Sequence, residues 1–272
     1  MGHASKMTLS LVATDHDELC HGWSWEIEDE EELVDQVARV TLGQYRHVSK
    51  VLQRLAPRPP TTTAEHVADA LDKLALDADG SSSKRDGWIF QVISWIAANA
   101  NRGNAFIRAP HIRKADHGFD GMQLEMSPDG STVSAVVIFE DKATTSPRST
   151  VIKKVWPEVK KLEIGQRITE LTHEVTSMLE AIHGSASDFA IEEAVENIIW
   201  KNARRYRISI TVGDEHVDQK ARQGLFKGFN DRVSGNVNRR RAETICIPDM
   251  RDWMEAFTDK VETRISELAP HV

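Results

Sequence analysis

The stretch SAVVIFEDK, residues 134–142, decides the expected fold, because six small or β-prone residues run directly into three charged ones. An apolar run of this length, bounded by turn residues, predicts a buried strand. The turn signal Ser-Pro-Asp-Gly at 127–130 precedes it, so residues 121–127 are its expected antiparallel partner. The sequence therefore predicts a hairpin whose second strand ends in charge.

The charged strand end indicates a functional site. Side chains alternate along a strand, so Glu140 and Lys142 share one face and Asp141 points to the other. Asp120 lies at the start of the partner strand and is expected close to the same point. Charges at the end of a core strand are costly unless they are paired or bind a metal. We therefore expect Asp120, Glu140 and Lys142 to act together.

These residues resemble the motif of the PD-(D/E)xK, or restriction-endonuclease-like, nuclease superfamily. That motif has an acidic residue on one strand and acid-x-Lys on the next. Here Asp120 is followed, after 19 residues, by the Glu-Asp-Lys at 140–142. Phe119 stands where the name-giving proline would be. Many members carry a glutamate on the preceding helix, where this chain offers Gln91 and Asp86.

The resemblance covers roughly residues 85–161 and implies a metal-dependent deoxyribonuclease. Asp120 and Glu140 would bind Mg²⁺ or Mn²⁺ through carboxylate oxygens, and Asp141 would add its backbone carbonyl. Lys142 would orient the attacking water and stabilise the developing negative charge. Compact nucleases of this kind resemble effector subunits of bacterial restriction or anti-phage defence systems.

Other interpretations of the same residues stay open. A plain ion pair between Glu140 and Lys142 would suit a non-catalytic interaction subunit of a nucleic-acid-processing complex. Asp116 and His117 precede the first carboxylate and are either alternative ligands or loop residues. The acidic and histidine run at 214–218 has a metal-like composition, which a polar turn explains equally well.

The expected fold class is α/β. The order of a helix before a hairpin predicts a restriction-endonuclease-like core, with a mixed, mainly antiparallel sheet flanked by helices. Residues 1–83 read as a helical N-terminal region that ends in a flexible Gly/Ser link, and residues 84–272 as the nuclease-like domain.

Periodicity predicts the individual elements. Apolar residues at helical spacing predict helices over 33–55, 63–76, 85–101, 157–183, 188–203 and 250–268. Strands are expected at 105–112, 121–127, 134–142, 206–212 and 244–247, and the strand at 206–212 alternates as a half-buried strand does. The apolar stripe of the last helix predicts a core contact or a two-fold interface.

Composition narrows the class of protein. The net charge of −8 argues against a protein that coats nucleic acid non-specifically. The two cysteines, Cys20 and Cys246, have no metal-type spacing and favour a reducing, cytoplasmic setting. No apolar stretch reaches membrane-spanning length, so no membrane partner is expected.

Basic residues near the predicted site and in one later segment are candidates for phosphate contact. Residues 201–241 hold 11 basic and 4 acidic side chains, against the acidic balance of the whole chain. The candidates are Arg113, Lys114, Arg204, Arg205, Arg239, Arg240 and Arg241. Pairing with the acidic segments of the chain is the alternative.

The expected partner is nucleic acid, with DNA as the substrate. The sequence has no Gly-rich phosphate loop, so ATP hydrolysis by this chain is not expected. One site cuts one strand at a time, which predicts either a homodimer or a helicase or ATPase partner subunit.

Overall fold

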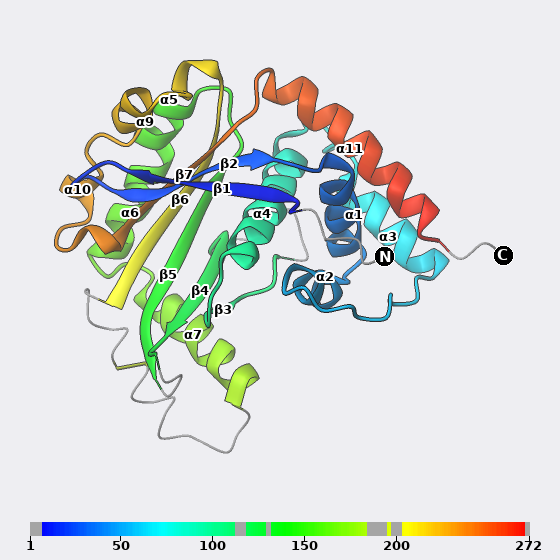
Figure 1. The fold of residues 1–272 in the computed structure, drawn as a ribbon, viewed down its shortest axis with the longest axis horizontal. Helices are drawn as coiled ribbons and strands as arrows, with labels where there is room; N and C mark the ends of the chain where they lie inside the picture. The colour runs from blue at the N-terminus through cyan, green and yellow to red at the C-terminus, as the bar shows by residue number, and fades with distance from the viewer. Residues whose placement is uncertain (1–6, 112–117, 129–131, 184–194, 197–202, 270–272) are drawn as a thin grey trace.

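The computed structural model describes residues 7–111, 118–128, 132–183, 195–196 and 203–269. A seven-stranded mixed sheet runs through the molecule with helices on both sides (Figure 1). Helices α1 to α4 and α11 gather on one side, and α5, α6, α7, α9 and α10 on the other (Figure 1). The fold class is therefore α/β with a mixed sheet, as predicted. The sheet is not mainly antiparallel, however, because three of the six strand pairings in the described residues are parallel.

The elements have the following bounds. The strands are β1 (Leu9–Asp15), β2 (His21–Ile27), β3 (Phe106–Ile107), β4 (Gly121–Met126), β5 (Val133–Lys142), β6 (Arg204–Val212) and β7 (Arg240–Cys246). The helices are α1 (Glu30–Thr41), α2 (Tyr45–Leu52), α3 (Ala64–Leu74), α4 (Ser83–Ala100), α5 (Pro147–Thr150), η1 (Val151–Val155), α6 (Trp156–Glu163), α7 (Ile168–His183), η4 (Asp214–His216), α9 (Gln219–Leu225), α10 (Phe229–Arg232), η5 (Val237–Arg239) and α11 (Met250–Glu267).

The strand order is β1-β2-β7-β6-β5-β4-β3. β3, β4 and β5 form the antiparallel part, with Gly121 opposite Phe139, so the predicted hairpin is confirmed. β5, β6, β7 and β2 are parallel neighbours, and β1 closes the other end antiparallel to β2. The long α5–α7 segment makes the crossover that parallel strands require.

The parallel centre of the sheet is buried on both faces. β6 was expected to be half-buried, yet Arg207, Ser209 and Thr211 are all at most 1% exposed. That prediction was wrong because α4 covers the face that the alternation assigned to solvent. β6 and β7 also begin earlier than predicted, since Arg204 and Arg240 are already strand residues.

The N-terminal region is not only helical. β1 and β2 form a hairpin that the sequence did not predict, and β2 pairs in parallel with β7. The single helix predicted over 33–55 is instead two helices, α1 and α2, because the chain turns at Gly43, whose φ is 79°. Asp29 caps α1 by accepting from the Glu32 N–H at 3.1 Å, and Thr63 caps α3, which was predicted. The sheet and one apolar core thus cross the boundary predicted at residue 83.

Apolar side chains form a core on each face of the sheet. On one face α6 and α7 pack on β5 and β6 through residues such as Val159, Val175, Ile138 and Ile208. On the other face α1, α3, α4 and α11 pack around Trp25 of β2. The sheet therefore lies between two apolar cores.

The helices predicted over 157–183 and 188–203 have different outcomes. The single helix expected from 157 to 183 is split into α6 and α7 at Gly165, whose φ of 83° ends α6. The helical segment that contains α6 already starts with α5 at Pro147. The pattern at 188–203 lies almost entirely outside the described residues.

The stripe of α11 belongs to the core. Met250, Met254, Phe257, Val261 and Ile265 are each at most 3% exposed and pack against the N-terminal helices. The core interpretation of this stripe is confirmed, and these side chains are not available to a dimer interface. None of the described helices is both long and apolar enough to cross a membrane.

Candidate functional site

The three predicted catalytic side chains meet at one point. The Lys142 Nζ lies 2.9 Å from the Asp120 Oδ2 and 2.6 Å from the Glu140 Oε1. Their side chains are 18–23% exposed, so solvent reaches the cluster. Glu140 and Lys142 share a face of β5, as the alternation predicts, and Asp120 directly precedes β4.

Backbone packing brings Asp120 to this position. A Cβ on Gly121 would lie 2.5 Å from the Phe139 ring, so only glycine lets β4 begin this close to β5. The Asp120 Oδ2 accepts from the Asp141 N–H at 2.8 Å, which continues the hairpin ladder through a side chain. From α4, the Gln91 Nε2 donates to the Asp120 Oδ1 at 2.7 Å.

Gln91 is therefore a fourth residue of the cluster. The sequence offered it beside Asp86 without choosing between them. Asp86 instead binds Arg85 at 3.0 Å and also pairs with Arg251, away from the cluster. The sequence feature that could have identified Gln91 is its position as a polar residue, three positions after Trp88, within the apolar stripe of a predicted helix.

The loop that carries Asp120 is clamped from three sides. The Arg108 Nη2 donates to the Phe119 carbonyl at 2.5 Å, and the His111 Nε2 lies 2.5 Å from the same oxygen. The Arg167 guanidinium lies over the Phe119 ring, 4.3 Å from its centroid. These contacts fix the peptide next to the Asp120 carboxylate, and no local pattern in the sequence indicates them.

Burial sets the electrostatics of the cluster. Burial raises the pKa of Glu140 to about 7, with Asp120 adding to the increase and Lys142 opposing it. Burial alone would lower the pKa of Lys142, but Glu140 and Asp120 outweigh it and raise this pKa above its usual range. The lysine therefore stays charged, and the site holds two acidic groups around one fixed cation.

Asp141 faces the opposite side of the sheet. It is 4% exposed, its Oδ1 accepts from the Ser94 Oγ at 2.7 Å, and burial raises its pKa to about 7. Its side chain is therefore not a ligand beside Asp120 and Glu140, as the alternation predicts. A metal role for Asp141 is restricted to its backbone carbonyl.

A buried polar network continues from Asp141 under the cluster. Arg207 donates to the Ser94 Oγ at 2.9 Å and to the Glu243 Oε2 at 2.7 Å, and Trp25 donates to the same carboxylate oxygen at 2.8 Å. Arg207 also lies 4.4 Å from the centroid of the Phe139 ring, which packs on α4. The alternation of β6 hid this network because it assigned Arg207 to solvent.

The possible metal ligands of the cluster suit a hard cation chemically, but they are few. Asp120 and Glu140 offer oxygen donors that converge on one positive group, which suits Mg²⁺ or Mn²⁺. Across the described part of the chain, no three His, Cys, Asp or Glu side chains cluster as metal ligands do. Any ion here would rely on two carboxylates, a backbone carbonyl and water.

Three of the arginines predicted to bind phosphate are interior residues. Arg204, Arg239 and Arg240 are 4%, 4% and 2% exposed. The Arg239 Nη2 lies 2.5 Å from the Glu163 Oε1, and Arg240 donates to four backbone carbonyls within 2.9 Å, among them that of Leu19. This corrects the expectation of phosphate contact, because the guanidinium forks are occupied by the chain itself.

The other predicted contacts are less buried or fall outside the description. Arg205 and Arg241 both pair with Glu125 of β4, and Arg241 lies 5.1 Å from the centroid of the Trp23 ring. Their contact with phosphate stays a prediction. Arg113, Lys114, Asp116 and His117 lie outside the described residues. The run at 214–218 forms a turn in which Asp218 caps α9.

An exposed basic surface lies on η1 and α6 instead. Lys153, Lys154, Lys160 and Lys161 are all exposed, while Val155 and Val159 between them face the core. Of the four, Lys161 pairs with Glu158, and the other three have no ion pair among the described residues. Glu158, on the same helix as Lys160 and Lys161, also raises the pKa of Glu140.

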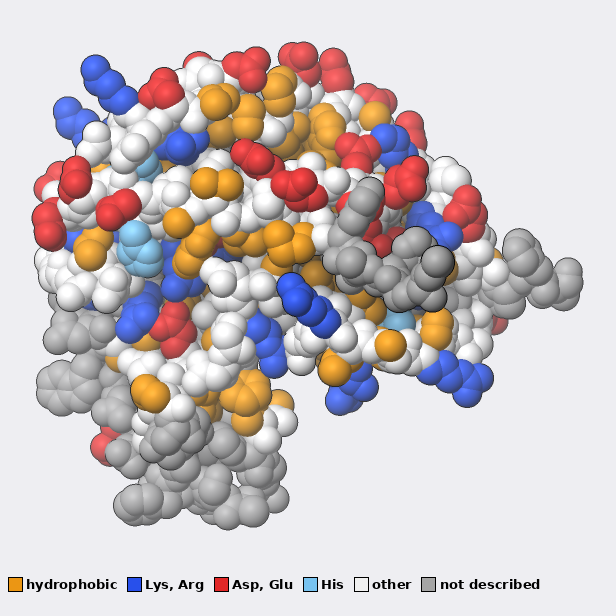
Figure 2. Space-filling view, in the orientation of Figure 1, with side chains coloured by type: hydrophobic (Ala, Val, Ile, Leu, Met, Phe, Trp, Pro, Cys, Tyr) orange, Lys and Arg blue, Asp and Glu red, His pale blue; other side chains and the backbone are white. Residues whose placement is uncertain are grey.

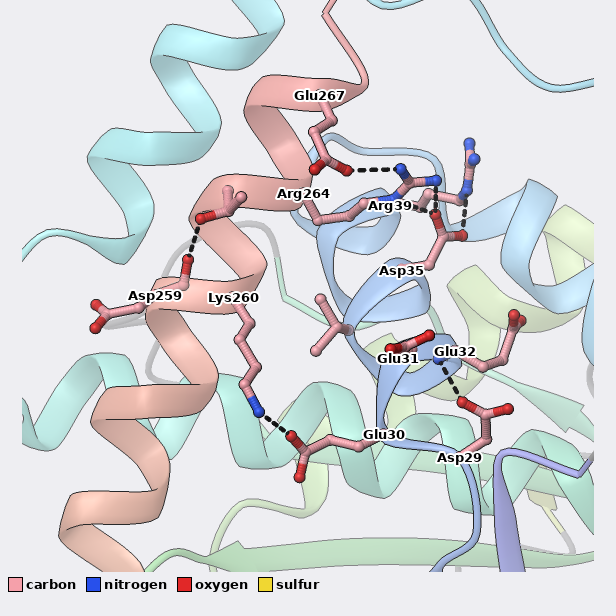
Figure 3. A pocket seen from close by; sticks show the side chains of 12 residues that line it. Asp29, Glu30, Glu31, Glu32, Asp35, Arg39, Asp259, Lys260, Arg264 and Glu267 are labelled. Carbon is pink, nitrogen blue, oxygen red and sulfur yellow. Dashed lines mark hydrogen bonds and ion pairs between the residues drawn. The ribbon is translucent and has the colours of Figure 1, made fainter.

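A pocket separate from the cluster lies between α1 and α11 (Figure 3). Its volume is about 830 Å³, and carboxylates dominate its walls. The cations there are already paired: Lys260 with Glu30, and Arg264 with Asp35 at 2.7 Å (Figure 3). The pocket is a polar seam between two helices that pack through their apolar faces.

Comparison with known proteins adds no assignment. A scan against models of protein families found no match, and a search of curated proteins found none either.

Proposed function

We propose that this protein is a metal-dependent nuclease that hydrolyses phosphodiester bonds, with DNA as its substrate. The observation that carries the proposal is the meeting of Asp120, Glu140 and Lys142 at one partly exposed point. A restriction-endonuclease-like core is the corresponding proposal for the fold. It is supported by the order of α4, the antiparallel β3–β5 and the parallel β6.

The roles of the residues follow from their contacts. Asp120 and Glu140 would hold a Mg²⁺ or Mn²⁺ ion, which supplies charge neutralisation at the scissile phosphate. Gln91 and the Asp141 N–H hold the Asp120 carboxylate in a single orientation. Lys142 stays protonated, so it would stabilise the developing negative charge and orient water by donating hydrogen bonds, rather than accept a proton.

The exposed lysines of η1 and α6 support a polyanionic substrate. In a chain of net charge −8, exposed cations without an acidic partner are suited to phosphate contact. The resemblance to PD-(D/E)xK effectors is the basis for proposing a cytoplasmic role in a restriction or anti-phage system.

The test is cleavage of supercoiled, linear and single-stranded DNA with Mg²⁺, Mn²⁺ or EDTA. Glu140→Gln and Lys142→Ala are each expected to lower the rate by roughly 100-fold or more. Glu125→Gln is the matched control, because Glu125 is also an ion-paired strand glutamate with an 18% exposed side chain. Equal activity in all three variants would remove the cluster from the mechanism.

A second candidate function is a non-catalytic interaction subunit with the same fold. The direct Glu140–Lys142 ion pair of 2.6 Å is the observation that favours it, because a structural pair needs no metal. Wild-type protein without cleavage in any metal, together with a lowered melting temperature for Lys142→Ala, would support this function over the nuclease.

A further inference from the structure

The outer edge of β1 has no strand partner among the described residues. β1 is the first strand in the sheet order, and all seven of its residues, Leu9–Asp15, pair with β2 on the other side (Figure 1). The opposite edge of the sheet is different, because β3 has only two residues, Phe106–Ile107. A seven-residue edge is long enough to pair with another strand.

Hydrogen bonds at the two ends of the hairpin establish which groups point outward. The Glu28 N–H donates to the Thr8 carbonyl at 3.1 Å, and the His16 N–H donates to the Cys20 carbonyl at 3.0 Å. Paired residues of an antiparallel ladder alternate between bonded and non-bonded positions. The even-numbered residues of β1 therefore bond to β2.

The odd-numbered residues direct their N–H and C=O groups away from the sheet. These residues are Leu9, Leu11, Ala13 and Asp15. The Asp15 carbonyl accepts from the Gln219 Nε2 at 2.7 Å, which closes that end of the edge. Leu9 is only 2% exposed, so its outward groups are covered as well. Leu11 and Ala13 remain with backbone donors and acceptors that another strand would satisfy.

The middle of this edge lacks the devices that prevent intermolecular pairing. Edge strands are usually blocked by lysine, proline, a bulge or an inward-pointing charge. From Leu9 to Thr14 this strand has no charged residue and no proline, and its register with β2 is continuous. Val12 is 52% exposed in the middle of it.

We infer that β1 pairs antiparallel with β1 of a second copy of this chain across a two-fold axis. The strand is self-complementary in that arrangement, because its uncharged centre lies against itself. Asp15, the one charged residue of β1, is at the end and faces the start of the partner strand, so like charges do not meet. A two-fold pairing is closed and produces a dimer, not a filament.

The inference is independent of the proposed nuclease activity. It is compatible with that activity, since a dimer would carry two clusters for two strands. It also places the interface away from α11, whose stripe is buried. The mass of the protein in solution tests it whether or not the protein cleaves DNA.

The experiment is light scattering with size-exclusion chromatography over the micromolar range. Wild-type protein is expected to have the mass of two chains. Ala13→Pro removes an outward N–H and leaves the β1–β2 bonds intact, so it should give the mass of one chain with a native circular dichroism spectrum. Val12→Lys should do the same by placing a cation on the edge.

Val217→Lys is the matched control, because Val217 is also 52% exposed but lies next to η4. It should stay dimeric. Hydrogen–deuterium exchange of the peptide that contains β1 should also slow as protein concentration rises. A wild-type mass of one chain throughout, or a dimer that survives both Val12→Lys and Ala13→Pro, would overturn the inference.

Discussion

At the scale of single residues, the face of β5 on which a charged side chain lies decides its surroundings. Glu140 and Lys142 reach the partly exposed cluster, while Asp141 between them enters the dry layer under α4. In that layer the Asp141 carboxyl group accepts a hydrogen bond from Ser94 and is attracted by the positive charge of Arg207, and both lower its pKa. It also loses its hydration, which raises its pKa. Burial is the larger effect, and this raises the pKa of Asp141.

Asp141 should make folding stability depend on pH. Its pKa of about 7 in the folded state lies above the ordinary value of 3.8, so between these values the folded state retains a proton that the unfolded state has lost. The stability penalty is absent below the unfolded pKa, grows as pH rises toward 7, and is complete above it. Asp141→Asn should therefore make the decrease of the free energy of unfolding with pH less steep, by up to about 1.4 kcal/mol per pH unit.

Denaturant unfolding at several pH values between 4 and 8 measures this effect. The comparison is the slope of the free energy of unfolding against pH, since the variant also changes a hydrogen bond and so shifts the absolute stability. Identical slopes in wild type and Asp141→Asn would show that this carboxyl group titrates as it does in the unfolded chain.

At the scale of elements, the helical segment after β5 combines two surfaces. Its inner side packs on the sheet through Val155, Trp156 and Val159, and its outer side presents lysines. The Trp156 N–H bonds to the Val151 carbonyl five residues back, which is the π-helical turn before Pro157. Lys153 and Lys154 lie on this turn, next to the helix whose Glu158 influences Glu140.

The lysines of this segment should contribute to nucleic-acid binding. In the cleavage-deficient Glu140→Gln background, Lys153→Ala with Lys154→Ala should weaken duplex binding. It should also make the slope of log affinity against log salt less steep by roughly 0.9 per lost contact. The control is Lys50→Ala with Lys260→Ala, which removes two exposed cations from α2 and α11. Fluorescence anisotropy measures both, and equal slopes in the two variants would count against contact at this segment.

At the scale of the whole molecule, the sheet joins the two ends of the chain. β2 lies between β1 and β7, and the core around Trp25 combines α1 with α4 and α11. Acidic side chains line the rim of the molecule along α11 (Figure 2), where Arg264 pairs with Glu267 and with Asp35 of α1. Residues before and after position 83 therefore share both hydrogen bonds and buried apolar surface.

This arrangement predicts that residues 84–272 do not fold alone. The full chain should unfold in one cooperative transition, which tryptophan fluorescence and circular dichroism should both report at the same midpoint. The fragment loses β1, β2 and the helices that cover α4, so we expect it to aggregate or to unfold without a cooperative transition. A soluble fragment with its own sharp transition would support two separate domains instead.

Local patterns in the sequence were sufficient for much of the fold. Helical periodicity predicted α3, α4 and α11, and the apolar run with its turn predicted β4 and β5. The alternation along β5 placed Glu140 and Lys142 together and turned Asp141 away. These features depend on neighbours within a few residues, and a sequence displays such neighbours directly.

Only the tertiary structure decided which polar residues are inside. Arg207 and Arg240 look like surface cations in sequence, but α4 covers one and the β1–β2 turn supplies carbonyls to the other. Gln91 became part of the cluster because α4 crosses the start of β4. Partners that lie tens to hundreds of residues away determine burial and hydrogen bonding, so local composition and periodicity do not reveal them.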